Sequence, residues 1–374
     1  MENGSGIVIS IGTKAEIIKC MPLMAELQKQ KKGYWFIHTG QHSLKDSYEK
    51  FEIKKPDFVL SKVPEKNNTK FWSKINKSSI LWTFMTIYKI RKIARKIKPK
   101  YVIYHGDTMS SAATAIATSS LLNPGRKWKN VHLEAGLRSG SLLEPFPEEI
   151  SRRICDRFSD VLLAVSDLTE NNLKKNMGFL SKKKVIKIGN TIVDSALITY
   201  EKAKKMYKME KNPYALINIH RHENIRSKKR MKQIAGILKE IKINAIWPMH
   251  DSTKHYLESY GLMGSVKEMK NLRITPLEDY FKFIFLLANC KYLICDGGSI
   301  QEESLVFKKP CIILRKKTER PEGLGTGINF LTKFNRSYSK KLIGDIENNK
   351  LKNKKFSNPY GEEGLSKKII EILK

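Results

Sequence analysis

The sequence contains few cysteines, no paired cysteine spacing and no long apolar run. Its five cysteines are scattered over 374 residues, at positions 20, 155, 290, 295 and 311. An odd number without a C-x-x-C pair argues against a disulfide framework and favours free thiols in a reducing cytoplasm. No stretch approaches about 18 consecutive apolar residues, and the N-terminus lacks a basic segment followed by an apolar run. We therefore expect a cytoplasmic protein without a membrane span or signal peptide.

Acidic residues are also scarce. There are 37 Asp and Glu against 70 Lys and Arg, which leaves a formal net charge of +33. Such a charge can indicate binding to nucleic acid or to an anionic surface. However, the basic residues are mostly Lys and are spread along the whole chain, without a known nucleic-acid-binding motif or interleaved aromatic residues. We predict a lysine-rich solvated surface and regard nucleic acid as an unlikely partner.

Short apolar runs alternate with longer stretches of helical spacing, and the length fits two domains. The predicted strands are 7–11, 35–38, 101–104, 131–134, 161–165 and 185–188, followed by 214–219, 245–248, 272–274, 292–295 and 311–314. Such alternation builds parallel sheets covered on both faces. We predict an α/β protein with two doubly wound, Rossmann-like domains, 1–192 and 193–357, that face a central cleft. Ligands of such sheets bind beyond the carboxyl ends of the strands.

The G-x-G-x-x-G fingerprint of a dinucleotide site is missing after the first strand, which argues against nicotinamide chemistry. The first junction instead reads Gly12-Thr13-Lys14. Its backbone N–H groups, hydroxyl and cation could bind a phosphate, although a glycine there can also serve turn geometry alone.

Several acids follow the next strands of the first domain. Asp107 comes directly after a predicted strand, Glu134 ends another, and Glu148 and Glu149 open a helix. These carboxylates are candidates for general acid and base catalysis. The alternatives are a helix N-cap for Asp107 and ordinary ion pairs of the glutamates with nearby arginines such as Arg152.

The second domain has polar residues at two strand ends. His220-Arg221-His222-Glu223 lacks the H-E-x-x-H spacing and a third distinctive ligand, so we predict no metal site. Asp296-Gly297-Gly298-Ser299 lies between a strand and a helix. Successive glycines permit the close approach of a diphosphate to backbone amides at a helix start.

In this order, the motifs resemble those of the non-hydrolysing UDP-N-acetylglucosamine 2-epimerases. The resemblance covers nearly the whole chain and rests on these segments: Gly12-Thr13, Gly106-Asp107-Thr108, Glu134-Ala135-Gly136-Leu137-Arg138, Pro147-Glu148-Glu149, Gly189-Asn190-Thr191, His220-Arg221, Asp296, Gln301-Glu302-Glu303, Thr318-Glu319-Arg320-Pro321-Glu322 and Asn358-Pro359-Tyr360-Gly361. It implies the glycosyltransferase-B architecture, a terminal helix (358–374) that returns to the first domain, a homodimer, and no cofactor.

The family interconverts UDP-N-acetylglucosamine and UDP-N-acetylmannosamine by eliminating UDP to 2-acetamidoglucal and adding it back. The resemblance implies acid and base roles for Asp107, Glu134 and Glu148, while His220 faces the diphosphate. It further implies that the substrate is bound by Lys14, Lys19, Arg138, Arg152, Phe283 near the uracil, Glu303 on the ribose hydroxyls, and Gly297, Gly298, Ser299 and Arg320 on the phosphates. A hydrolysing 2-epimerase, an epimerase of a modified UDP-sugar and a non-catalytic binder of UDP-sugars or nucleic acid are the alternatives.

Two phosphate-binding turns depart from the family pattern. Lys14 and Ala15 stand where the family usually has Arg and Pro. The ammonium group of a lysine therefore replaces a planar guanidinium that can bind a phosphate through two parallel hydrogen bonds. Ser299 follows Gly297 and Gly298, whereas the usual serine precedes the two glycines. The acids show no such departure.

Overall fold

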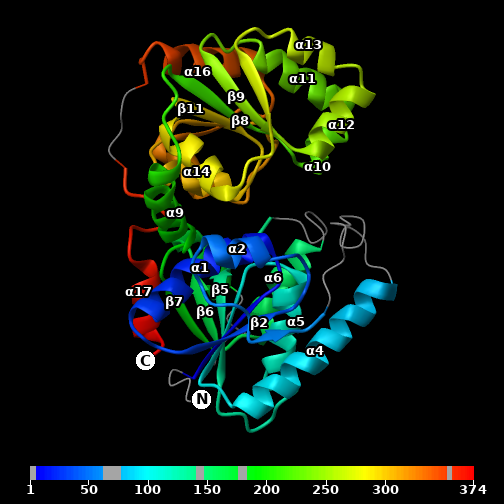
Figure 1. Ribbon diagram of the computed structural model, residues 1–374, viewed down its shortest axis with the longest axis vertical. Helices are drawn as coiled ribbons and strands as arrows, with labels where there is room; N and C mark the ends of the chain where they lie inside the picture. The colour runs from blue at the N-terminus through cyan, green and yellow to red at the C-terminus, as the bar shows by residue number, and fades with distance from the viewer. Residues whose placement is uncertain (1–5, 62–76, 140–146, 176–182, 352–355) are drawn as a thin grey trace. The chain divides into compact units, whose positions relative to one another are not determined.

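A computed structural model describes residues 6–61, 77–139, 147–175, 183–351 and 356–374. The chain divides into two compact units, the first formed by Met1–Ser195 with Tyr360–Lys374 and the second by Ala196–Pro359. Each unit has its own parallel sheet (Figure 1). The expected limits, at 192 and 357, lie within a few residues of these boundaries.

The first unit is built on a seven-stranded sheet in the order β3-β2-β1-β4-β5-β6-β7. The strands are β1 (Ile7–Ile11), β2 (Tyr34–His38), β3 (Phe58–Val59), β4 (Tyr101–His105), β5 (Lys129–Ala135), β6 (Val161–Ala164) and β7 (Lys184–Lys187). The helices are α1 (Lys14–Lys29), α2 (Lys45–Lys50), α4 (Lys77–Ile97), α5 (Met109–Thr118), α6 (Glu148–Phe158), α7 (Asp167–Lys174) and α17 (Leu365–Ile372), while α9 (Ile192–Met206) crosses the boundary. Every residue of β1 is buried, as expected for a strand covered on both faces.

The C-terminal helix α17 packs against α1 of the first unit. The carboxylate of Asp194 accepts hydrogen bonds from the backbone N–H groups of Gly364 (2.8 Å) and Ser366 (2.7 Å). These amides belong to the start of the helix, where no intrahelical acceptor exists, so Asp194 satisfies them and anchors α17.

The second unit has a six-stranded sheet in the order β10-β9-β8-β11-β12-β13. The strands are β8 (Tyr214–Asn218), β9 (Asn244–Met249), β10 (Leu272–Pro276), β11 (Tyr292–Cys295), β12 (Cys311–Ile313) and β13 (Asn329–Leu331). The helices are α10 (His222–Ile225), α11 (Lys228–Leu238), α12 (Asp251–Ser259), α13 (Met263–Lys267), α14 (Tyr280–Asn289), α15 (Ser299–Val306) and α16 (Arg336–Glu347), with a 3₁₀ helix at Pro321–Thr326.

Alternate residues of β8 enter different apolar clusters. Ala215 and Ile217 pack with Met231 of α11, whereas Leu216 packs with Ile284 of α14. Since successive side chains of a strand point to opposite faces, helices cover both sides of this sheet. The predicted fold class, with two doubly wound parallel sheets, is confirmed.

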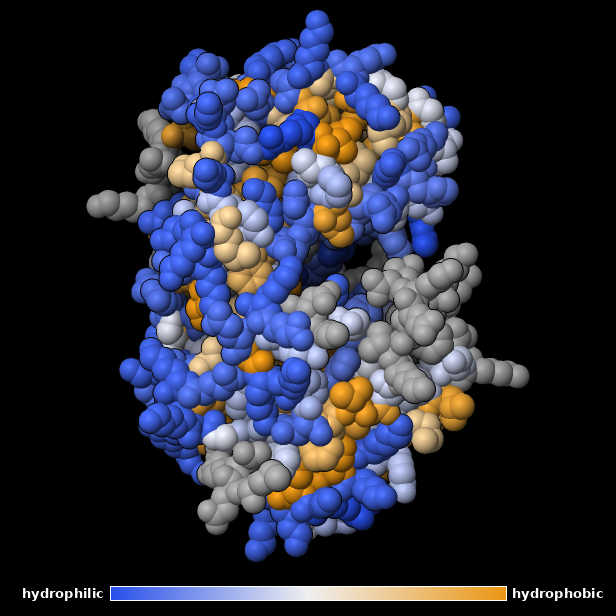
Figure 2. All heavy atoms as spheres, viewed as in Figure 1, coloured by the Kyte–Doolittle hydropathy of each residue, from blue (hydrophilic) through white to orange (hydrophobic). Residues whose placement is uncertain are grey.

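Figure 2 shows hydrophilic residues distributed widely over the visible face of the molecule. All five cysteines are buried and free. Within the described ranges, no helix is both long and apolar enough to cross a membrane.

Candidate functional site

A buried carboxylate occupies the first strand-to-helix junction. Glu16 accepts hydrogen bonds from the backbone N–H groups of Gly12 (2.8 Å) and Thr13 (2.7 Å), and Thr13 caps α1 in return. Burial raises the pKa of Glu16, although these hydrogen bonds oppose the effect. The two amides are therefore already bonded within the protein. The expectation that they are free to bind a phosphate is wrong, while Lys14 beside them is exposed.

Glu16 also connects this junction to the next one. Its second oxygen accepts from the hydroxyls of Thr108 (2.7 Å) and Ser111 (2.6 Å). Thr108 is the N-cap of α5, so the interpretation of Asp107 as a helix cap is wrong. The carboxylate of Asp107 instead binds Nη2 of Arg152 on α6.

Glu134 lies at the end of β5 with an unusual backbone conformation. Its φ is +65°, which is costly for a residue with a side chain, and the register of β5 and β6 shifts beside it. Oε1 of Glu134 pairs with Nζ of Lys19 and accepts from the side-chain amide of Asn190 (2.8 Å). The strained turn thus directs the carboxylate toward a lysine from α1 and an asparagine that precedes α9.

A neutral histidine stands on the other side of Glu134. Nε2 of His105 lies 3.6 Å from Oε2 of Glu134. Burial lowers the pKa of His105 to about 3, since loss of hydration outweighs the attraction of the nearby carboxylates. At neutral pH, Lys19 therefore places a positive charge beside Glu134, whereas His105 does not.

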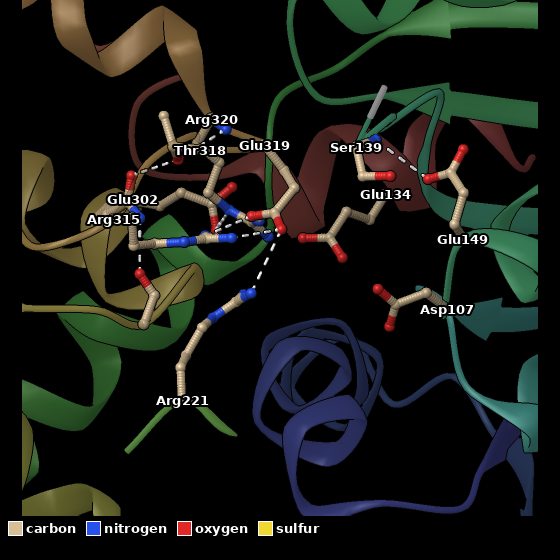
Figure 3. A network of polar contacts seen from close by, with 12 residues as sticks. Asp107, Glu134, Ser139, Glu149, Arg221, Glu302, Arg315, Thr318, Glu319 and Arg320 are labelled. Atoms are coloured by element: carbon tan, nitrogen blue, oxygen red, sulfur yellow. Dashed lines mark hydrogen bonds and ion pairs between the residues drawn. The ribbon is translucent and has the colours of Figure 1, made fainter. Parts of the chain in front are cut away.

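Helix α6 places a buried cation, Arg152, among these acids. Arg152 is buried and reaches Glu149 (Nη1 to Oε2, 3.3 Å) as well as Asp107. Glu148 opens the same helix one turn before Arg152. The carboxylates of Asp107 and Glu134 are turned to the same side (Figure 3). The carboxyl end of the first sheet therefore gathers several acids around Arg152 and Lys19, a set suited to moving protons.

In the second unit, Asp296 organises the end of β8. This fully buried carboxylate accepts from the backbone N–H groups of His220 (3.0 Å) and Arg221 (3.0 Å) and from the side chain of Asn224 (3.0 Å). The three hydrogen bonds hold the polar turn that follows the strand.

His220 stacks on His250, with ring centroids 4.7 Å apart. Loss of hydration lowers the pKa of both rings, to about 4 for His250, although Asp296 opposes this. Both imidazoles are therefore neutral at physiological pH, so His220 can donate a hydrogen bond but carries no full charge.

The paired glycines precede α15, and an arginine lies over them. A Cβ atom added to Gly298 would come within 3.1 Å of Nη1 of Arg320. Nε of Arg320 lies 3.1 Å from Oε2 of the buried Glu302, while Ser299 begins the helix. The start of α15 and a guanidinium thus lie close together, a combination typical of phosphate sites.

A second group of charges lies beside Arg320. Arg315 forms two hydrogen bonds to Glu319 (2.7 and 2.9 Å), and Arg221 approaches the same carboxylate at 3.5 Å (Figure 3). Burial opposes ionisation, but the arginines hold the pKa of Glu319 well below its usual range. Three arginines therefore meet one interior carboxylate, and Glu223 and Glu302 also pair with members of this group. Such a cluster of guanidinium groups can bind an anionic ligand.

Helices α14 and α15 bring together the residues expected near a nucleoside. The hydroxyl of Tyr280 donates to Oε1 of Glu303 (2.8 Å). Phe283 follows Tyr280 by one turn and is half-buried against the core. Among the described residues, no group of three His, Cys, Asp or Glu side chains is arranged to hold a metal ion.

Known proteins of one family match this chain over nearly its whole length. A family model described as UDP-N-acetylglucosamine 2-epimerase matches residues 25–374. This chain belongs to that family. The UDP-N-acetylglucosamine 2-epimerase of Methanocaldococcus jannaschii is 32% identical, over 98% of both chains. A crystal structure of the Methanocaldococcus jannaschii UDP-GlcNAc 2-epimerase in complex with UDP-GlcNAc and UDP has a TM-score of 0.76 at 32% identity, covering 98% of this chain and 99% of that one.

One of the similar proteins is named for a different sugar nucleotide. The UDP-2,3-diacetamido-2,3-dideoxy-D-glucuronate 2-epimerase of Pseudomonas aeruginosa is 31% identical over 87% of both chains. Membership of the 2-epimerase family alone therefore does not define the sugar.

The structure distributes the expected epimerase residues over the two units. Asp107, Glu134, Glu148, Lys19 and Arg152 lie at the carboxyl end of the first sheet. The second unit contributes the others: His220, Phe283, Gly297, Gly298, Ser299, Glu303 and Arg320. The guanidinium of Arg138 pairs with Asp156 inside the first unit.

The sequence alone indicated no role for His105, His132 or Asp156, although His105 and His132 come one and two residues before the family motifs that begin at Gly106 and Glu134. Polar residues within apolar strands could have indicated that these histidines have a specific role. Their partners could not be predicted, because they come from distant segments: His132 hydrogen-bonds to Asp156 and to the carbonyl oxygen of Gly106.

Proposed function

We propose that this protein is a UDP-N-acetylglucosamine 2-epimerase that interconverts UDP-N-acetylglucosamine and UDP-N-acetylmannosamine. The main support is that the carboxylates of Asp107 and Glu134 pair with Arg152 and Lys19 at one sheet edge, where Glu148 begins α6, in a chain of this family. Inversion at C2 needs proton transfer on both faces of the sugar, and this sheet edge supplies more than one carboxylate.

The reaction proceeds by elimination and return. A carboxylate takes the proton from C2, the electrons of that bond form the C1=C2 double bond, and the C1–O bond breaks with its electron pair leaving on UDP. In the return step UDP attacks C1, and an acid delivers a proton to the opposite face of C2. The acids of the first unit act on the sugar. Neutral His220 donates a hydrogen bond to the departing diphosphate.

The second unit binds the UDP portion. The amides at Gly297, Gly298 and Ser299 and the guanidinium of Arg320 bind the diphosphate. Glu303 accepts from the ribose hydroxyls, and Phe283 contacts the uracil. Tight binding of UDP keeps the leaving group available for its return, as an epimerase requires and a hydrolase does not.

The experiment that tests this function is turnover of UDP-N-acetylglucosamine in heavy water, followed by proton NMR. We expect UDP-N-acetylmannosamine to accumulate and deuterium to appear at C2 of both nucleotide-linked sugars. Free N-acetylmannosamine with UDP would indicate a hydrolysing enzyme. Turnover of UDP-2,3-diacetamido-2,3-dideoxyglucuronate alone would assign the chain to the modified sugar, and salt-sensitive binding of nucleic acid without turnover would reject an enzyme.

The protein acts as a homodimer in the cytoplasm. Helix α4 exposes an apolar stripe at helical spacing, formed by Ile80, Leu81, Phe84, Met85 and Tyr88. Contiguous apolar surface of this kind favours association with another protein surface. Five buried free thiols are compatible with a reducing compartment.

A further inference from the structure

Both ring nitrogens of His132 face acceptors inside the first unit. Nε2 lies 2.9 Å from the carbonyl oxygen of Gly106, and Nδ1 lies 2.8 Å from Oδ1 of Asp156. A carbonyl oxygen can only accept, so Nε2 carries a hydrogen. An ionised carboxylate can only accept as well, so Nδ1 carries the second hydrogen.

The surroundings of Asp156 favour its ionised form. Burial by itself would raise the pKa of Asp156, but the hydrogen bonds from His132 and Arg138 and the positive charge of Arg138 hold it below its usual value. Oδ2 of Asp156 lies 2.7 Å from Nη2 of Arg138. His132 is fully buried, and the Asp156 side chain is 5% exposed. Such a carboxylate compensates the buried imidazolium, which would otherwise be costly.

The imidazolium is connected to the proposed acid and base Asp107 through the backbone. Gly106 has a φ of +76° and forms the turn between β4 and α5, immediately before Asp107. His132 holds the carbonyl oxygen of this turn, and Arg152 holds the carboxylate of Asp107. Asp107 is thus restrained both at the peptide group that precedes it and at its side chain.

One face of α6 supplies both restraints. Arg152 and Asp156 are four residues apart, so they project from the same side of the helix. Arg152 reaches Asp107 directly, while Asp156 acts through His132. A shift of either restraint would change the direction in which the Asp107 carboxylate points.

We propose that His132, held as an imidazolium by Asp156, is a positioning residue that aligns Asp107 by its hydrogen bond to the Gly106 carbonyl. The inference rests on the proposed function, because Asp107 needs alignment only in a chain that performs the epimerisation. His132 does not touch the sugar, and its effect is on turnover. A displacement of about 1 Å in a reacting group can reduce a rate about 100-fold.

Two conservative variants separate alignment from packing. His132→Gln places an amide N–H near the former Nε2 and keeps a donor for Gly106, whereas His132→Asn places it near Nδ1 and keeps a donor for Asp156. We expect His132→Asn to lower kcat about 100-fold and His132→Gln no more than about tenfold, with KM changed less than about threefold in both. Equal losses, or a greater loss for the Gln variant, would show that the histidine only supports the core.

Nitrogen-15 NMR of the wild-type protein provides a test that does not depend on the variants folding. At pH 7.5 we expect one buried histidine with hydrogen on both ring nitrogens, and we expect this signal to be lost in Asp156→Asn. A ring with a single N–H at this position would overturn the proposal. Wild-type turnover is measured first, so that absence of epimerase activity, which rejects the proposed function, is distinguished from an incorrect assignment of His132.

Discussion

The ammonium group of Lys19 and the carboxylate of Glu134 form an ion pair whose side chains are only 7% and 4% exposed. Lys19 comes from the middle of α1, whereas Glu134 ends β5. The resemblance suggested that Lys19 binds substrate. In this structure, its charge is directed at one of the proposed catalytic acids.

Replacement of Lys19 by Met should destabilise the protein. The change leaves a buried carboxylate without its cation, and breaking one side of a buried pair costs about 3–5 kcal/mol. Urea unfolding measures this loss. Lys29→Met is the matched control, since Lys29 is an exposed residue of the same helix, and we expect a change below about 1 kcal/mol. Equal losses of stability in the two variants would show that the buried Lys19–Glu134 pair stabilises the protein no more than an exposed lysine does.

Neutral replacement of the proposed acids should greatly reduce turnover while the protein remains folded. Asp107→Asn, Glu134→Gln and Glu148→Gln each remove a group that moves a proton, which is worth about 10² to 10⁴ in rate. Steady-state epimerisation kinetics with circular dichroism measure rate and folding together. Asp167→Asn, at an exposed pair with Lys187, should retain wild-type kcat. Near-normal turnover of all three variants would refute their assignment.

Acid should destabilise the protein partly through His105. Its pKa is about 3 in the folded protein and about 6.5 when unfolded, so between these values the unfolded chain binds more protons. The free energy of unfolding therefore falls as the pH decreases from about 6.5 toward 3, by about 1 kcal/mol per pH unit for this residue.

His105→Gln removes this contribution and should make the pH dependence of unfolding shallower between pH 6.5 and 4. Denaturant titrations at several pH values measure the slope. His255→Gln, at an exposed position on α12, should leave it as in the wild type. A slope unchanged by His105→Gln would mean that the imidazole is already protonated in the folded state.

Addition of one methyl group at Gly298 should weaken the binding of UDP. The new Cβ would meet Nη1 of Arg320 at 3.1 Å and displace the guanidinium that is proposed to bind phosphate. Loss of one charged hydrogen bond costs about 1.5–3 kcal/mol, which corresponds to about 10- to 100-fold in Kd. Calorimetric titration with UDP measures the change. Gly236→Ala, which meets no atom within 4 Å, should bind as the wild type does.

Charges on the apolar stripe of α4 should dissociate the proposed homodimer. Leu81 and Phe84 are 63% and 67% exposed, so replacement of both by Asp should leave the fold intact and halve the mass measured by light scattering. Leu121→Asp places a charge at another exposed leucine and should leave the mass unchanged. A wild-type protein that is already monomeric contradicts the proposal directly.

The order of strands and helices could be predicted because each depends on a local period of apolar residues. The exceptions are β3, whose two residues are too few to show alternation, and β13, which has three. The family could also be recognised from the sequence, because its motifs are short segments at strand ends. The assignment of Asp107 and Glu134 as catalytic acids comes from these motifs and stays a prediction.

The partners of these residues could not be predicted, because tertiary packing chooses them. The amides of Gly12 and Thr13 are bonded to Glu16, which also binds Thr108, 92 residues away. Likewise, His132 joins Asp156 to the carbonyl of Gly106, 26 residues before it. The sequence by itself determined the elements, their order and the chemical groups at the sheet edges, since these follow from neighbouring residues. Only the folded chain decided which donor meets which acceptor, because burial leaves each polar group to the partner that packing brings within reach.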